Sequence, residues 1–154
     1  MSGHLCMNLL NCQVYGVFIS VTERGNAPTV LLNVGNGDFI PIYIGLWEAI
    51  SITNALHHHT LPRPIAHDLF SDLFNRFTLS LEAIHIDVIE DGVFFAKLIV
   101  KKDEHEETLD CRPSDGIAIA LRLKAPILIA EEVVKKASVN RDELQKMVDI
   151  KDYL

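Results

Sequence analysis

Residues 79–102 read LSLEAIHIDVIEDGVFFAKLIVKK, and this stretch indicates the fold class. It contains two runs rich in β-branched and aromatic residues, separated by Asp91-Gly92. That dipeptide is a strong signal for a tight turn between antiparallel strands, so the stretch predicts a β-hairpin. The run VFFAKLIV is long and apolar, and a strand edge or face that one small sheet leaves uncovered invites a twofold partner. We therefore expect a homodimer or a higher homo-oligomer.

Further strands are predicted on both sides of this hairpin. Upstream, the runs NLLNCQVYGVFIS, TVLLNV and FIPIYI have strand composition, and the turn segments ERGNAP and GNGD separate them. Downstream, ETLD and PILIA are short strand candidates. Helices are predicted between the strands, at 46–58, 66–77, 116–124 and 131–137. The combination predicts an α+β fold, with a mixed, largely antiparallel sheet or sheets and short helices.

The second predicted helix has the clearest amphipathic pattern. Five apolar residues recur there at helical spacing and predict a stripe that faces the core: Leu69, Phe70, Leu73, Phe74 and Phe77. Asp68 falls on the opposite face, and His67 lies at the edge of the stripe.

The length of 154 residues suits one domain with its own core. We predict a loose leader at 1–7, a folded domain at 8–137 and a helical tail at 138–154. In the tail, Asn140 is followed three residues later by Glu143, which is typical of a capped helix.

Charge and cysteine usage restrict the expected partners and compartment. The net charge is −7, so the chain lacks the excess of Lys and Arg that drives non-specific binding to nucleic acid. Any polynucleotide would have to bind at a local site. Three cysteines with no metal-type spacing demand no disulfide, and no apolar run approaches the roughly 20 residues of a membrane-spanning helix. A cytoplasmic protein without a membrane partner is expected.

A short internal similarity connects two of the predicted helices. The segment LWEAISITNAL at 46–56 aligns with PSDGIAIALRL at 113–123, which places Glu48 on Asp115. Each segment follows a short strand. The alignment is explained either by chance or by a duplicated strand-helix unit. An acid in a first helical turn is favoured by the helix dipole alone, by roughly 0.3–1 kcal/mol.

Three charged residues crowd the entry to the apolar run at 116–124: Asp110, Arg112 and Asp115. They form either a structural ion-pair junction or a binding site. Together with two upstream blocks, PIYIGLWEA and PRPIAHDL, the stretch LDCRPSDGIAIALR resembles the signature blocks of the bifunctional nuclease family. The resemblance covers roughly residues 8–137. It departs from the family pattern at Ala66, where threonine is usual, and at Gly116, where alanine is usual.

The resemblance implies an internally duplicated α+β fold, a homodimer, and cleavage of both DNA and RNA. The residues themselves supply candidates for this chemistry. His67, Asp68, Asp110 and Asp115 are candidate acids, bases or charge stabilisers at phosphorus. Glu48, Asp68 and Asp115 are candidate ligands for Mg²⁺ or Mn²⁺, which would make the hydrolysis metal-assisted.

Two arginines are candidate phosphate ligands, because a planar guanidinium matches phosphate oxygens. Arg63 stands between two prolines in a loop, and Arg112 stands between the acids described above. The histidine run 57–59 is interpreted as a solvated helix end, because adjacent helical side chains point about 100° apart.

A second functional hypothesis remains beside the nuclease. The chain would then be a non-enzymatic homo-oligomeric binding or scaffold module, with a charged junction that is only a structural ion-pair network. An open site that joins both arginines, His67 and two or more acids favours the enzyme. An enclosed Arg112, saturated by its neighbours, favours the structural network.

Overall fold

The computed structural model describes residues 7–144 and 146–153, and its centre is a single sheet of nine strands within those residues. The order is β6-β5-β4-β7-β1-β2-β3-β8, and β9 pairs with β1 off this path. The strands are β1 (Leu9–Thr22), β2 (Gly25–Gly35), β3 (Asp38–Tyr43), β4 (Ser80–Glu90), β5 (Val93–Lys102), β6 (His105–Cys111), β7 (Ile127–Ala130), β8 (Val139–Asn140) and β9 (Met147–Asp149). Most of the predicted leader, 1–7, lies outside the described residues.

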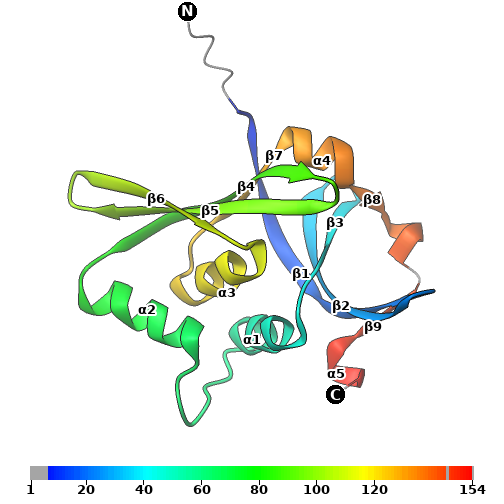
Figure 1. Ribbon diagram of the computed structural model, residues 1–154, viewed down its shortest axis with the longest axis horizontal. Helices are drawn as coiled ribbons and strands as arrows, with labels where there is room; N and C mark the ends of the chain where they lie inside the picture. Colours follow the sequence, from blue (N-terminus) through cyan, green and yellow to red (C-terminus); the bar gives the residue numbers. More distant parts are fainter. Residues whose placement is uncertain (1–6, 145, 154) are drawn as a thin grey trace, which may run out of the picture.

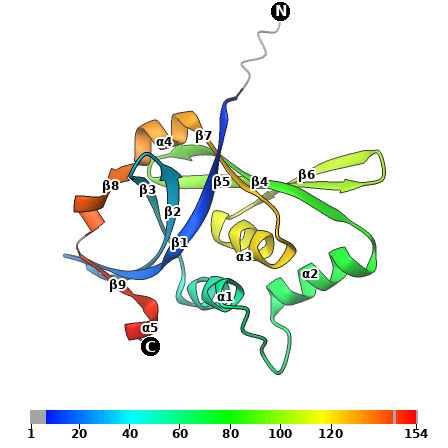
Figure 2. The ribbon, with the colours of Figure 1, turned by 180° about the vertical axis from the view of Figure 1, so that it is seen from behind.

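The helices are short, as the sequence predicts. They are α1 (Leu46–Leu56), α2 (Ala66–Arg76), α3 (Pro113–Leu123), α4 (Glu131–Ala137) and α5 (Ile150–Tyr153), with one 3₁₀ turn, η1 (Arg141–Leu144). Figures 1 and 2 show α1, α2 and α3 gathered on one side of the curved sheet, whereas α4 lies on the other side. The α+β prediction is confirmed. No helix in the described parts of the chain is long and apolar enough to span a membrane.

The sheet is mixed but largely antiparallel. Its one long-range parallel pairing joins β4 to β7, and the other neighbours along the path run antiparallel. The hairpin of β4 and β5 turns at Asp91 and Gly92, which have φ values of 51° and 78°. Both positive values suit the tight turn that the Asp-Gly dipeptide predicts.

Helix α3 lies at the centre of the core. Residues 116–120 are all buried, and they pack against β4 and β5. The helix approaches β4 so closely that a methyl group on Gly116 would overlap the side chain of Ile84, which is fully buried. A glycine at this position therefore matches a large neighbour on the sheet.

The predicted core-facing stripe of α2 is wrong for three of its five residues. Phe74 is buried, but Leu69, Leu73 and Phe77 are 53%, 50% and 61% exposed. The reason is that α2 contacts the core mainly through α3 and does not lie flat on the sheet. Its outer apolar residues consequently face solvent.

The C-terminal segment also differs from the predicted capped helix. Asn140 Oδ1 does accept a hydrogen bond from the backbone N–H of Glu143, at 3.2 Å. The helix stops after one 3₁₀ turn, however, and residues 147–149 form β9 against β1. A free stretch of β1 backbone offers these residues a full set of strand hydrogen bonds, which outweighs their helical spacing.

Candidate functional site

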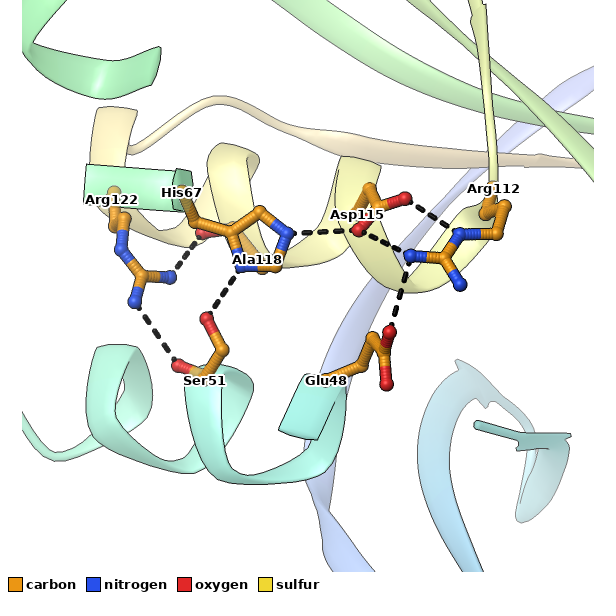
Figure 3. Close-up of polar contacts among 7 residues, drawn as sticks. All are labelled: Glu48, Ser51, His67, Arg112, Asp115, Ala118 and Arg122. Carbon is orange, nitrogen blue, oxygen red and sulfur yellow. Dashed lines mark hydrogen bonds and ion pairs between the residues drawn. The ribbon is translucent and has the colours of Figure 1, made fainter. Parts of the chain in front are cut away.

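A network of polar contacts joins three helices on one side of the sheet (Figure 3). Glu48 and Ser51 come from α1, His67 from the start of α2, and Asp115 from the first turn of α3. Arg112 is the residue directly before α3. The network therefore forms at the place where the N-terminal ends of helices from distant parts of the sequence meet.

Arg112 is the most exposed member of this network. Its backbone is extended, with φ −70° and ψ 144°, as expected for a residue that precedes a proline. Its Nε donates to Asp115 Oδ2 at 2.8 Å, and its Nη2 donates to Asp115 Oδ1 and to Glu48 Oε1, both at 3.1 Å. The side chain is 65% exposed, and Nη1 makes no hydrogen bond within the described residues. Figure 3 shows this nitrogen directed away from Asp115.

His67 connects Asp115 to a buried serine. Its Nε2 lies 2.9 Å from Asp115 Oδ1, and its Nδ1 lies 2.6 Å from Ser51 Oγ. Both ring nitrogens are thus engaged, and the side chain is only 15% exposed. Ser51 itself is 2% exposed. The series Ser51, His67, Asp115 contains the residue types of a hydrolase triad, but a serine this buried has no access to substrate.

The charges in the network stabilise one another. Burial raises the pKa of Asp115, but hydrogen bonds from Arg112 and His67 outweigh that effect, so its pKa lies below the ordinary value. The same hydrogen bond raises the pKa of Arg112. Asp115 therefore stays ionised, and the guanidinium of Arg112 pairs with the carboxylates of both Asp115 and Glu48.

A second arginine, Arg122, ties the same helices together from inside. Its Nε donates to Asp68 Oδ1 at 2.7 Å, Nη1 to the Ala118 carbonyl at 2.9 Å, and Nη2 to the Ser51 carbonyl at 3.3 Å. The side chain is 11% exposed. Burial raises the pKa of Asp68, but hydrogen bonds from Arg122 and from the Ile65 backbone lower it below the ordinary value.

The sequence reasoning missed Arg122 and Ser51. A signal for Arg122 was present, because it is the single charged residue in the apolar run IAIALRL, and a charge in such a run requires a buried partner. Ser51 carried no comparable signal, since serine is common on both faces of short helices.

The family is shown by comparison with known proteins. Residues 30–142 match the sequence model of the bifunctional nuclease domain. The chain belongs to the bifunctional nuclease domain family. An uncharacterised protein of Mycobacterium tuberculosis is 34% identical over 155 residues, which cover 91% of this chain and 93% of that protein. Bifunctional nuclease 1 of Oryza sativa subsp. indica is 26% identical over 117 residues, covering 71% of this chain but 35% of the rice protein. Bifunctional nuclease 2 of Oryza sativa subsp. japonica is 23% identical over 133 residues, covering 83% and 41%.

In this bifunctional nuclease domain, the three sequence blocks of the family meet at the polar network. The first block contributes Glu48, the second His67, and the third Arg112 with Asp115. Asp68 of the second block pairs with Arg122 instead. Blocks that lie far apart in the sequence thus supply one surface.

Two predicted site residues, Arg63 and Asp110, make no hydrogen bond or ion pair with this network in the described part of the chain. Arg63 is exposed in the loop between α1 and α2, and Asp110 is exposed on β6, opposite Lys97 of β5. The end of the histidine run, His58 and His59, lines a separate pocket of about 510 Å³ beside Asp68 and Arg122.

The three acids predicted as metal ligands do not gather into one donor set. Asp115 and Glu48 share Arg112, whereas Asp68 is held by Arg122. No group of three or more His, Cys, Asp or Glu side chains in the described part of the chain could hold a metal ion. The Mg²⁺ or Mn²⁺ requirement stays a prediction.

The two cysteines that the structure describes, Cys12 and Cys111, are unsuited to act as nucleophiles. Burial raises the pKa of Cys12 to about 12 and, together with the nearby Asp115 and Asp110, that of Cys111 to about 11. Both thiols are therefore protonated near neutral pH, and the thiolate is the reactive form.

Proposed function

We propose that this domain hydrolyses phosphodiester bonds in DNA and RNA with low sequence selectivity, at the surface around Arg112. One observation carries the proposal: an exposed guanidinium is held in place by carboxylates from two helices and keeps Nη1 free of any partner among the described residues. The names of the plant relatives, bifunctional nucleases, support the same activity.

Arg112 is proposed to bind the phosphate. Its Nη1 carries two N–H donors that can reach phosphate oxygens without breaking the existing contacts. Where closer contact is needed, Arg112 can exchange a contact with a carboxylate for one with the phosphate, because its own side chain is 65% exposed. Asp115 and His67 are positioning residues in this scheme, since each is fixed by contacts on both sides.

Glu48 is proposed to accept the proton of the attacking water. One of its oxygens, Oε1, receives Arg112 Nη2, whereas Oε2 accepts no hydrogen bond from the described residues. A carboxylate beside a phosphate-binding arginine can orient water and take its proton. The roles predicted for Asp68 and Asp110 stay predictions, and single Asn substitutions at those positions test them.

The decisive experiment is cleavage of labelled single-stranded and duplex oligonucleotides by the full chain. Arg112→Met keeps the aliphatic stem, and Arg112→Lys keeps the charge without the planar fork. We expect the Met variant to lose about 100-fold or more in rate, the usual scale for losing one key charge-stabilising donor. Arg24→Met is the matched control, because Arg24 is exposed in the turn between β1 and β2. Equal cleavage by the wild type and Arg112→Met would refute the assignment and point to a contaminating nuclease.

The same assay tests the remaining sequence predictions. Parallel reactions with Mg²⁺, with Mn²⁺ and with a chelator test the metal requirement. Arg63→Met tests whether the loop arginine contributes to phosphate binding. A rate that depends on Arg112 and is unchanged by chelator would contradict metal assistance while leaving the hydrolase intact.

A specific observation also favours the second candidate function, a homo-oligomeric binding or scaffold module. Helix α2 exposes Leu69, Leu73 and Phe77, and neighbouring exposed apolar side chains are typical of protein interfaces. Sedimentation equilibrium of the wild type and of Leu73→Glu tests this module. A mass near 17.3 kDa for the wild type at micromolar concentration contradicts it. An oligomer without nuclease activity would make the module the better description.

A further inference from the structure

We propose that the pocket beside Arg112 receives an unpaired nucleobase, so that the domain selects single-stranded nucleic acid. The inference rests on the proposed function, because it assumes that Arg112 holds the phosphate. It assigns a different part of the substrate, the base, to a different set of side chains.

The pocket lies where three segments of the chain meet. It is formed by residues 42–45 at the end of β3, residues 92–94 at the start of β5, and residues 112–114 at the start of α3. Its volume is about 410 Å³, within the range of about 300–1,000 Å³ that is usual for small-molecule sites. Arg112 forms one wall, so a phosphate on this arginine would bring its own nucleoside to the pocket.

Apart from Ser114, the remaining side chains that line the pocket are apolar or aromatic, and two of them face solvent. Tyr43 is 62% exposed and Val93 is 56% exposed, and both line the pocket together with Phe94. Such walls suit the flat apolar face of a base. Stacking of a base on an aromatic side chain is worth about 1–3 kcal/mol, which corresponds to roughly 5- to 150-fold in affinity.

A third aromatic residue, Trp47, lies close in sequence to the residues that line this pocket. Trp47 follows Tyr43 by four residues and directly precedes Glu48, the other partner of Arg112. It is 79% exposed, although tryptophan is on average a highly buried residue. An exposed tryptophan and an exposed tyrosine on either side of the helix start give two surfaces on which successive bases can stack.

The charge of the chain explains why bases, and not the backbone, must supply the affinity. The net charge is −7, and Arg112 is the one cation among the residues that line this pocket. For single strands the logarithm of affinity falls with the logarithm of salt with a slope of about −0.7 per phosphate neutralised. One contact therefore predicts only about a 2.6-fold loss between 50 and 200 mM salt. A duplex hides its base faces and offers only the backbone, which this surface attracts weakly.

The test uses Trp47, the only tryptophan in the sequence, as its own reporter. Three probes of equal length with cleavage-resistant phosphorothioate linkages are titrated into the full chain: a single strand, its duplex, and a single strand with abasic sites. We expect the single strand to quench Trp47 fluorescence and to bind at least 10-fold more tightly than either other probe. Its affinity should change less than about 5-fold between 50 and 200 mM salt.

Variants assign the effect to particular side chains. By anisotropy of a labelled strand, Tyr43→Ser and Trp47→Ala should each weaken single-strand binding by 5-fold or more, whereas Trp47→Phe retains most of it. Tyr153→Ser is the matched control, because Tyr153 is an exposed aromatic residue in α5. Both target side chains are largely exposed, so folding should be preserved, and far-UV circular dichroism checks this.

The possible outcomes separate this inference from the nuclease proposal. If the duplex or the abasic strand binds as tightly as the intact strand, the base pocket is refuted, whether or not the chain cleaves DNA. The same holds if no probe binds. If the intact strand binds selectively and depends on Tyr43 and Trp47, but nothing is cleaved, the base pocket stands and the hydrolase proposal fails.

Discussion

Replacing Arg122 should destabilise the fold more than replacing Arg112, although both arginines pair with an aspartate. Arg122 is 11% exposed and makes three hydrogen bonds, to Asp68, to the Ala118 carbonyl and to the Ser51 carbonyl. These contacts join α1, α2 and α3. Arg112 is 65% exposed and lies at the rim of the same helices. Methionine is the informative replacement at both positions, because it keeps much of the aliphatic stem and removes only the polar contacts.

The expected magnitudes follow from burial. Breaking a buried ion pair costs about 3–5 kcal/mol, because the remaining charge is left uncompensated. Asp68 is 33% exposed and keeps its hydrogen bond from the Ile65 backbone, so the lower end, about 3 kcal/mol, applies to Arg122→Met. For a chain of this length that lowers Tm by roughly 6–12 °C. Arg112 is exposed, but its partners Asp115 and Glu48 are only 28% and 20% exposed, so losing these pairs should cost about 1–2 kcal/mol, between the scales for exposed and buried pairs.

The assay is urea denaturation followed by far-UV circular dichroism. Fluorescence is a poor probe of unfolding here, because Trp47 is already 79% exposed in the folded chain. We expect Arg122→Met to lower the midpoint strongly and Arg112→Met to lower it clearly less. If Arg112→Met destabilises as much as Arg122→Met, Arg112 is the structural ion-pair centre of the domain, and the proposed phosphate site loses its main support.

Three further predictions concern the surroundings of these arginines. Gly116→Ala should lower the free energy of unfolding by about 1–3 kcal/mol, because the new methyl group overpacks the core. Adding Ile84→Val should restore part of the loss, since valine lacks the terminal methyl that the new Cβ meets. If chemical denaturation shows that the two costs simply add, the overlap is refuted. The pKa of Asp115 is lowered on folding, so its ionised form stabilises the fold above the unfolded value of about 3.9. That stabilisation is lost as pH falls through the lowered pKa of the folded state. Below about pH 5, the free energy of unfolding of Asp115→Asn should therefore fall less steeply than that of the wild type. Parallel curves of unfolding free energy against pH for the two proteins would contradict this. Gly45→Ala should displace the carboxylate of Glu48 without backbone strain. We expect slower oligonucleotide cleavage and a change in stability of less than about 1 kcal/mol. Full activity would argue against Glu48 as the proton acceptor.

Much of the fold could be predicted because the relevant signals are local. The Asp91-Gly92 turn and the runs of β-branched residues each act through neighbouring residues. The start of α3 was predicted three residues too late, at 116 instead of Pro113. The stripe of α2 shows the limit of this reasoning. Spacing tells which side chains share a helix face, but only the position of the whole helix decides whether that face is covered. Here α2 contacts α3 along one edge, and Leu73 stays half exposed.

The site could be predicted only in part, for a related reason. The acids Glu48 and Asp115 were identified because they open two aligned helices, and the structure brings both to one arginine. The buried arginine, Arg122, was missed. Arg112 stands next to Asp115 in the sequence, so that pair could be expected, whereas nothing in the sequence shows that Asp68 and Arg122 lie close together. Those two residues lie 54 positions apart, and their contact depends on the packing of α2 on α3.

The alignment of the two strand-helix segments, β3 with α1 and β6 with α3, explains why the single arginine Arg112 pairs with both Glu48 and Asp115. Glu48 and Asp115 hold equivalent positions in the two helices, and the residues before those helices are Gly45 and Arg112. Both have extended backbone conformations, with φ −74° and −70°. Because Gly45 has no side chain, the carboxylate of Glu48 folds over it, into space that a Cβ would fill, and from there it contacts Arg112 of the other unit. A second arginine at position 45 would exclude that carboxylate and place two cations side by side. The asymmetry between glycine and arginine therefore gives each chain one guanidinium at this surface, the proposed phosphate ligand, and acids from both helices contact it.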